Sequence, residues 1–167
     1  MASLDEMTPC PVLSGLILAG GAGQRLGGED KAWLPWRGQP LFTHVLARMA
    51  PQVASLWVSA NRDPARYQPW LDDGSLRAVI ADDWPGTQGP LAGLASALPR
   101  LRAAGAGSDW LLVTPVDTPR LPADLGARLW QGLQAAGAER RLAIARCGDQ
   151  PHWLHMLLHL SLTDDLR

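Results

Sequence analysis

Cysteine, excess charge and long apolar runs are all scarce in this sequence of 167 residues. Its two cysteines, Cys10 and Cys147, form no paired-cysteine motif, so neither a disulfide framework nor a structural zinc site is expected. With 15 basic and 16 acidic residues, the chain lacks the excess of positive charge that is typical of proteins binding nucleic acid or an anionic membrane. No apolar run approaches the roughly 20 residues that span a bilayer, and the N-terminus lacks the pattern of a signal peptide. We therefore expect a cytoplasmic protein.

What the chain does contain is a regular alternation of short apolar runs and helical stripes. Hydrophobic residues make up 47% and charged residues 19%, which is typical of an ordered globular protein. The length favours one domain, and we expect residues 1–167 to form it. The apolar runs predict buried strands at 13–18, 55–60, 77–81, 110–116 and 142–145, and the stripes predict helices near 41–49, 91–101 and 122–136.

This βαβ rhythm predicts an α/β fold in which a mostly parallel sheet carries helices on both faces, in three layers. The strands are continuous apolar runs, as expected when both faces of a sheet are covered. In such sheets ligands bind at the carboxyl ends of the strands. The polar residues that follow the predicted strands are the segment 20–31, Asn61, Asp82 and Asp117, and we expect the site there.

The segment 18–31 reads Leu-Ala-Gly-Gly-Ala-Gly-Gln-Arg-Leu-Gly-Gly-Glu-Asp-Lys. Its glycines allow the backbone N–H groups to approach a polyphosphate, and Arg25 and Lys31 add positive charge. It is not a Walker loop, because Ala32 follows the lysine where Ser or Thr is required. It is not a dinucleotide loop either, because Leu26 stands where that pattern has its third glycine.

This loop resembles the signature of the nucleotidyltransferases with a glycosyltransferase-A-like, Rossmann-like fold, and within them the molybdenum cofactor guanylyltransferases. Three further segments agree in order and spacing: 58–62 is similar to the end of the family's second strand, 89–93 to its GPLAG loop and 115–119 to its metal-binding strand end. The resemblance covers about residues 13–125. It implies Mg²⁺-dependent transfer of GMP from GTP to molybdopterin, with release of pyrophosphate.

The resemblance also implies a role for each matching residue. Gly21 favours guanylyl transfer, since cytidylyl-transferring relatives often have Ala there. Catalysis would fall to Arg25, Lys31 and Asp117, with Asp117 as the Mg²⁺ ligand. The residues implied to bind the nucleotide are Leu18, Ala19, Gly20, Gly21, Lys31, Asn61, Asp82 and Asp117, with Asp83 as a neighbouring candidate for Asp82. The implied partners are GTP, a molybdopterin-type acceptor and proteins that insert or deliver the molybdenum cofactor, and we expect a monomer or weak oligomer.

Several alternatives stay open at this point. The same fold serves cytidylyl- and sugar-phosphate nucleotidyltransferases, and a homologue that binds nucleotide without catalysis would share these motifs. Asp117 could instead cap a helix, as Asp-Thr-Pro sequences do, and Asp82 could be a solvated turn carboxylate.

The C-terminal part departs from the family. The chain ends at Arg167 without the Asn-rich segment with which relatives bind molybdopterin, so we expect a domain that is short at this end. His152, His155 and His159 would share one face of a helix. With no nearby Glu to complete a zinc motif, we favour an apolar segment with polar edges.

Overall fold

The computed structural model describes residues 8–20, 29–83, 89–105, 107–137 and 139–166. In this part of the chain a six-stranded sheet has the order β5-β4-β1-β6-β8-β7. Its strands are β1 (Leu13–Leu18), β4 (Ser55–Ser59), β5 (Ala78–Ile80), β6 (Trp110–Pro115), β7 (Leu142–Cys147) and β8 (Gln150–His159). The first four are parallel, while β8 runs antiparallel to both β6 and β7. The predicted mostly parallel α/β sheet is confirmed.

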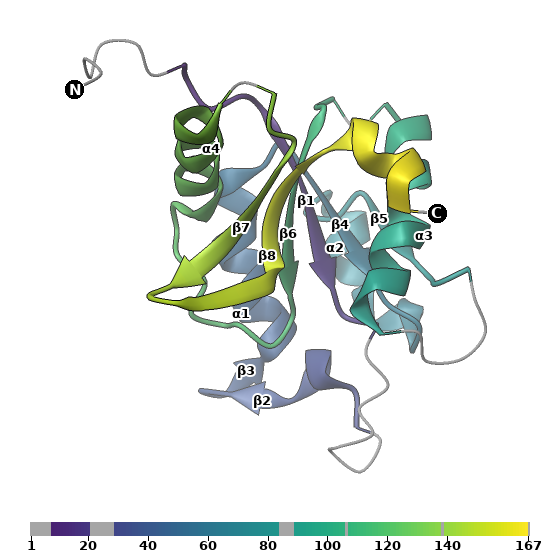
Figure 1. Ribbon diagram of the computed structural model, residues 1–167. Helices are drawn as coiled ribbons and strands as arrows, with labels where there is room; N and C mark the ends of the chain where they lie inside the picture. Colours follow the sequence, from purple (N-terminus) through teal and green to yellow (C-terminus); the bar gives the residue numbers. More distant parts are fainter. Residues whose placement is uncertain (1–7, 21–28, 84–88, 106, 138, 167) are drawn as a thin grey trace.

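Helices cover both faces of the sheet, which confirms the three layers (Figure 1). One face packs against α1 (Leu41–Met49) and α4 (Leu125–Ala136), and the other against α3 (Pro90–Ala103) and the 3₁₀ turn η6 (Leu160–Leu166). A short helix α2 (Gln68–Asp72) and the small ribbon of β2 (Pro35–Trp36) and β3 (Gln39–Pro40) complete the regular elements used below. Within the described residues, no helix is both long and apolar enough to span a bilayer.

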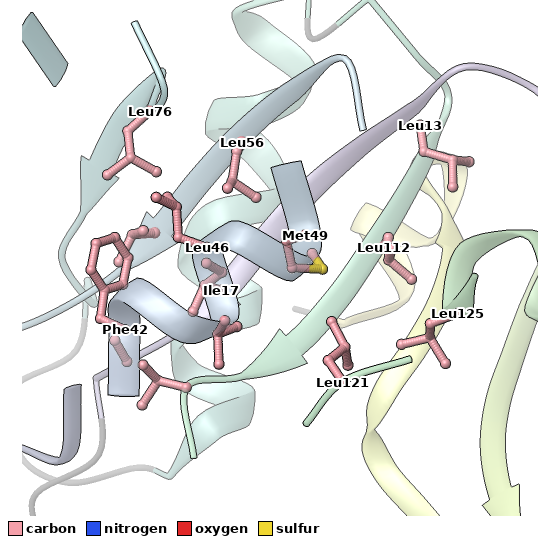
Figure 2. Close-up of a cluster of buried hydrophobic side chains, with 14 of the residues drawn as sticks. Leu13, Ile17, Phe42, Leu46, Met49, Leu56, Leu76, Leu112, Leu121 and Leu125 are labelled. Carbon is pink, nitrogen blue, oxygen red and sulfur yellow. The ribbon is translucent and has the colours of Figure 1, made fainter. Parts of the chain in front are cut away.

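The central strand β1 shows why its sequence is apolar throughout. Side chains alternate between the two faces of a strand, so Ile17 packs in the cluster beneath α1 while Leu16 and Leu18 pack beneath α3. All six residues of β1 are buried. Figure 2 shows the α1 side, where Phe42 and other side chains of the helix lie against the strand residues.

Within the six-stranded sheet, β8 is the strand that the sequence analysis did not predict. The predicted strand at 142–145 is present as β7, but β8 lies between it and β6. The two strands form a hairpin whose turn contains Gly148 at φ +57°, in the left-handed region where glycine is favoured. The pairing of β8 with β6 joins residues that are distant in sequence, so no local sequence pattern predicts it. The helix expected near 122–136 begins later, at Leu125.

Candidate functional site

The candidate site lies where the order of successive strands in the sheet reverses. From β1 the chain moves outward through β4 and β5, then returns to β6 on the other side of β1. Ligands of α/β sheets bind at the carboxyl ends of the strands beside such a switch point. Here Leu18 and Pro115 pair across β1 and β6, and a pocket of about 140 Å³ opens beyond them. Six of the residues predicted from the sequence line this pocket: Leu18, Ala19, Gly20, Lys31, Asp82 and Asp117.

Asn61 ties together the ends of three strands at this pocket. Its side-chain Nδ2 donates to the Asp82 carboxylate at 2.7 Å and to the Gly20 carbonyl at 3.3 Å. The Asp82 backbone N–H donates back to Asn61 Oδ1 at 2.8 Å. Asp82 is therefore held by a reciprocal pair of hydrogen bonds and is not a free turn carboxylate.

The neighbouring acid, Asp83, has a different position. Arg100 of α3 donates to both of its carboxylate oxygens, at 2.8 and 2.5 Å, and the Asp83 N–H donates to Ser96 Oγ at 2.9 Å. The Arg100 hydrogen bond holds the pKa of the Asp83 carboxyl below its usual value. Asp83 thus fastens α3 to the end of β5, and of the two acids only Asp82 lines the pocket.

The first turn of α3 forms one wall of the pocket. Gly89 precedes the helix with φ +77°, a conformation that favours glycine, and Pro90 takes the first helical position. A Cβ atom at Gly93 would overlap the Ser59 hydroxyl and come within 3.3 Å of Asp82 Oδ1, so only glycine allows this approach. The positive end of the α3 dipole therefore faces the pocket, as in anion-binding sites.

Lys31 and Asp117 face one another across the pocket. Lys31 Nζ lies 3.1 Å from Asp117 Oδ2, and the two side chains are 40% and 45% exposed. Lys31 starts the 3₁₀ turn η3 (Lys31–Trp33), in which the Asp30 carboxylate accepts from the Ala32 N–H at 3.0 Å. An exposed pair of this kind contributes at most about 1 kcal/mol. A phosphate or a cation can therefore replace either partner at little cost.

An aromatic cluster holds the Lys31 turn in place. The Trp33 ring packs at 5.0 Å from Tyr67 and 5.8 Å from Phe42, and Trp70 lies 6.2 Å away. The Arg66 guanidinium covers the Trp33 ring at 4.0 Å. Burial raises the pKa of the Tyr67 hydroxyl. These contacts join η3 to α1 and α2, and they fix the backbone position from which the Lys31 side chain extends.

The turn that carries Asp117 follows directly from β6. The Val116 N–H donates to the Leu18 carbonyl at 3.0 Å, and the Thr118 hydroxyl donates to the Pro115 carbonyl at 2.9 Å. The alternative that Asp117 caps a helix is wrong, because α4 begins at Leu125. Its carboxylate instead lines the pocket, where it pairs with Lys31.

The donor set fits Mg²⁺ bound together with a nucleotide. Among the described residues no group of three or more His, Cys, Asp or Glu side chains is placed to hold a metal ion. Mg²⁺ commonly takes one or two carboxylates and completes its shell with phosphate oxygens and water. Asp82 and Asp117 both line the pocket. Asn61 holds the Asp82 carboxylate, so Asp117, half-exposed beside Lys31, is the better placed of the two to supply the metal ligand.

The glycine-rich loop extends beyond the part of the chain that the structure describes. Gly21 and Arg25 lie outside the described residues. The Ala19 N–H donates to the Ser59 carbonyl at 2.7 Å, and the Leu18 carbonyl already accepts from Val116. These bonds fix the point at which the glycine-rich loop leaves β1.

The structure adds residues that the sequence analysis did not place at the site, including His155, which it had assigned to an apolar segment. Ser59 and Leu154 line the pocket, and His155 Nε2 lies 3.1 Å from Thr118 Oγ1. Leu154 and His155 arrive on the unpredicted strand β8, so no sequence signal could have placed them. Of the other histidines, the His152 ring lies 5.6 Å from His155, while His159 lies against Trp110.

A second, larger hollow of about 1010 Å³ opens next to the Asp117 turn, between α4 and the β7–β8 hairpin. Thr118, the residue after Asp117, lies on its wall. Most of its walls are apolar, from α4 and β7. Four arginines also line it: Arg120, Arg128, Arg140 and Arg146. The volume of this arginine-lined groove and its four guanidinium groups suit an anionic ligand.

Fold and pocket together define a class of protein, the Rossmann-like nucleotidyltransferases. The model of the MobA-like NTP transferase domain matches residues 15–167, and the chain belongs to this family. It is 46% identical over 154 residues to a molybdenum cofactor guanylyltransferase of Cereibacter sphaeroides, covering 92% of this chain and 72% of that protein. It is 39% identical over 156 residues to the protein of the same name in Yersinia pseudotuberculosis, covering 93% and 73% of the two chains.

Solved structures show the same fold. The molybdopterin-guanine dinucleotide biosynthesis protein A of Archaeoglobus fulgidus superimposes with a TM-score of 0.64 at 24% identity, over 92% of this chain and 70% of that chain. A 4-diphosphocytidyl-2C-methyl-D-erythritol synthase superimposes with a TM-score of 0.65 at 17% identity, over 93% and 79%. At these identities the likeness shows the fold alone.

Proposed function

We propose that this chain transfers GMP from GTP to the molybdenum cofactor, forming a guanine dinucleotide and releasing pyrophosphate. The observation that carries the proposal is the pairing of Lys31 with Asp117 at the switch point, 3.1 Å apart. It brings to one pocket a cation suited to binding phosphate and a carboxylate suited to binding Mg²⁺. The relatives at 46% and 39% identity, both named molybdenum cofactor guanylyltransferases, support GTP and this acceptor over the cytidylyl alternative.

The nucleoside of GTP lies on the Asn61 side of the pocket. Asp82 offers carboxylate oxygens, which accept from N–H or O–H donors of the nucleoside. Asn61 fixes that carboxylate and also the Gly20 carbonyl. The triphosphate then runs along the segment 19–31 toward Lys31, with the N-terminus of α3 facing it.

The reaction joins an oxygen of the acceptor phosphate to the α-phosphorus of GTP. The bond from the α-phosphorus to the bridging oxygen of the β-phosphate breaks, and pyrophosphate leaves with its electron pair. Lys31, with Arg25 from the glycine-rich loop, stabilises the negative charge that builds on pyrophosphate. Asp117 would hold Mg²⁺ together with the phosphates, and the ion would supply further positive charge there. The remaining work is positioning, which needs no covalent enzyme intermediate.

The acceptor occupies the arginine-lined groove. Thr118 lies on its wall next to Asp117, so a phosphate at that end of the groove can approach the α-phosphorus. Arginines bind phosphate oxygens in forked contacts. The apolar walls suit the ring system of molybdopterin.

A pyrophosphate-release assay with molybdopterin-type acceptor and Mg²⁺ tests this function. We expect release with GTP, little with CTP or ATP, and none without acceptor. Preference for CTP would favour the cytidylyltransferase alternative. GTP binding by calorimetry without any pyrophosphate release would favour a homologue that binds nucleotide and does not catalyse transfer.

A further inference from the structure

The turn that carries Asp117 is tied to β8 by a single long-range hydrogen bond. The Thr118 hydroxyl lies 2.9 Å from the Pro115 carbonyl, 3.1 Å from His155 Nε2 and 3.3 Å from Thr114 Oγ1. The contacts with Pro115 and Thr114 are local and belong to the same strand and turn. Of these three partners of the Thr118 hydroxyl in the described residues, His155 is the one that lies on another strand.

The chemistry of the three partners fixes the direction of each bond. A carbonyl oxygen only accepts, so the one Thr118 hydroxyl proton goes to Pro115. The Thr118 oxygen must therefore accept from His155, which requires a hydrogen on Nε2. Its second lone pair can accept from the Thr114 hydroxyl, which satisfies a side chain that is fully buried. The network assigns to His155 the tautomer with hydrogen on Nε2.

The surroundings of His155 favour the neutral form of its ring. Burial lowers the pKa of His155, nearby His152 lowers it further, and Asp117 opposes the shift. A neutral ring carries one N–H, and in the assigned tautomer this N–H is committed to Thr118.

We propose that His155 is a positioning residue for Asp117. By holding the Thr118 hydroxyl, it fixes the turn that aims the Asp117 carboxylate into the pocket, opposite Lys31. The proposal rests on the proposed function only in taking Asp117 as the ligand of Mg²⁺ bound with GTP. Partners that orient a metal ligand typically affect metal affinity or activity by about 10- to 100-fold.

The first test measures the Mg²⁺ concentration that half-saturates GTP binding, by calorimetry. We expect His155→Ala to raise it about tenfold or more and to leave Mg²⁺-free GTP binding unchanged. His155→Gln keeps an N–H donor in comparable reach and should recover most of the loss. His159→Ala is the matched control, since this histidine lies on the same strand and contacts Ser161 and Trp110.

A double-mutant cycle shows whether His155 acts through Thr118. In a Thr118→Val background the hydroxyl is gone, so His155→Ala should cause no further shift in Mg²⁺ affinity. An equal shift in both backgrounds would overturn the proposed route, and so would a His159→Ala variant that behaves like His155→Ala.

A second measurement is independent of turnover and of GTP. Imidazole ¹⁵N shifts of the free protein should show hydrogen on Nε2 of His155, and amide exchange in residues 116–121 should accelerate in His155→Ala. Hydrogen on Nδ1, or unchanged exchange, would overturn the proposal, even if His155→Ala proved too unstable for calorimetry. If wild-type protein released no pyrophosphate from any nucleotide, the proposed function would fail while these readings still decided the role of His155.

Discussion

Removing the Asp117 carboxylate should separate activity from stability. In the Asp117→Ala variant the turn keeps its backbone bond from Val116 to Leu18 and its Thr118 hydroxyl bond to Pro115. Only the contact with Lys31 is lost, and both side chains are 40–45% exposed. The free energy of unfolding should therefore fall by less than about 1 kcal/mol.

The effect on turnover should be far larger. The variant lacks the carboxylate proposed to hold Mg²⁺ at the reacting phosphates, and we expect pyrophosphate release to fall at least ~100-fold, or about 2.7 kcal/mol in activation free energy. Asp164→Ala is the matched control: this acid forms an exposed pair with Arg102, at 3.3 Å. It should share the small stability change and keep full activity.

Urea unfolding and a pyrophosphate-release assay on the same preparations measure the two quantities. Wild-type turnover in Asp117→Ala would refute the metal assignment. A loss of several kcal/mol in unfolding free energy would instead show that Asp117 is a structural residue.

The remaining predictions concern the other wall of the pocket and the core. Asn61→Ala releases both Gly20 and Asp82, and calorimetry should show GTP binding about tenfold weaker, since each lost hydrogen bond is worth roughly 1 kcal/mol; unchanged affinity would contradict the scaffold role. Asp83 has a lowered pKa through Arg100, so its stabilising contribution is present above about pH 4 and is lost as pH falls through the folded-state pKa. Unfolding of Asp83→Asn across pH 3–6 should therefore show a smaller acid-dependent loss than wild type, with equal slopes as the contrary result. Leu112→Ala, in the cluster of Figure 2, should lower the unfolding free energy by about 2–5 kcal/mol in urea, and a loss below 1 kcal/mol would mean that the core relaxes around the gap.

The sequence was sufficient for the parts of the fold that depend on local pattern. The run 13–18 is a buried strand because both faces are covered, and α1 begins after Pro40 where the helical stripe starts. The expectation that Lys31 and Asp117 lie near one pocket followed from the rule that strands of a parallel sheet share one carboxyl edge. The structure brings them to 3.1 Å.

The parts that sequence could not provide depend on contacts between distant segments. The run 150–159 alternates imperfectly and carries three histidines, and only its pairing with β6 makes it a strand. The sequence also could not show which of Asp82 and Asp83 lines the pocket. Contacts with distant residues decide this, because Asn61 binds the Asp82 carboxylate and Arg100 binds that of Asp83.

The most direct test of the account is a crystal structure with GTP and Mn²⁺ as a substitute for Mg²⁺, in which the metal is located by its anomalous signal. The account predicts a triphosphate along residues 19–31 and an anomalous peak at the Asp117 carboxylate. A metal bound elsewhere, or a nucleotide outside the pocket at the carboxyl ends of β1 and β6, would contradict it.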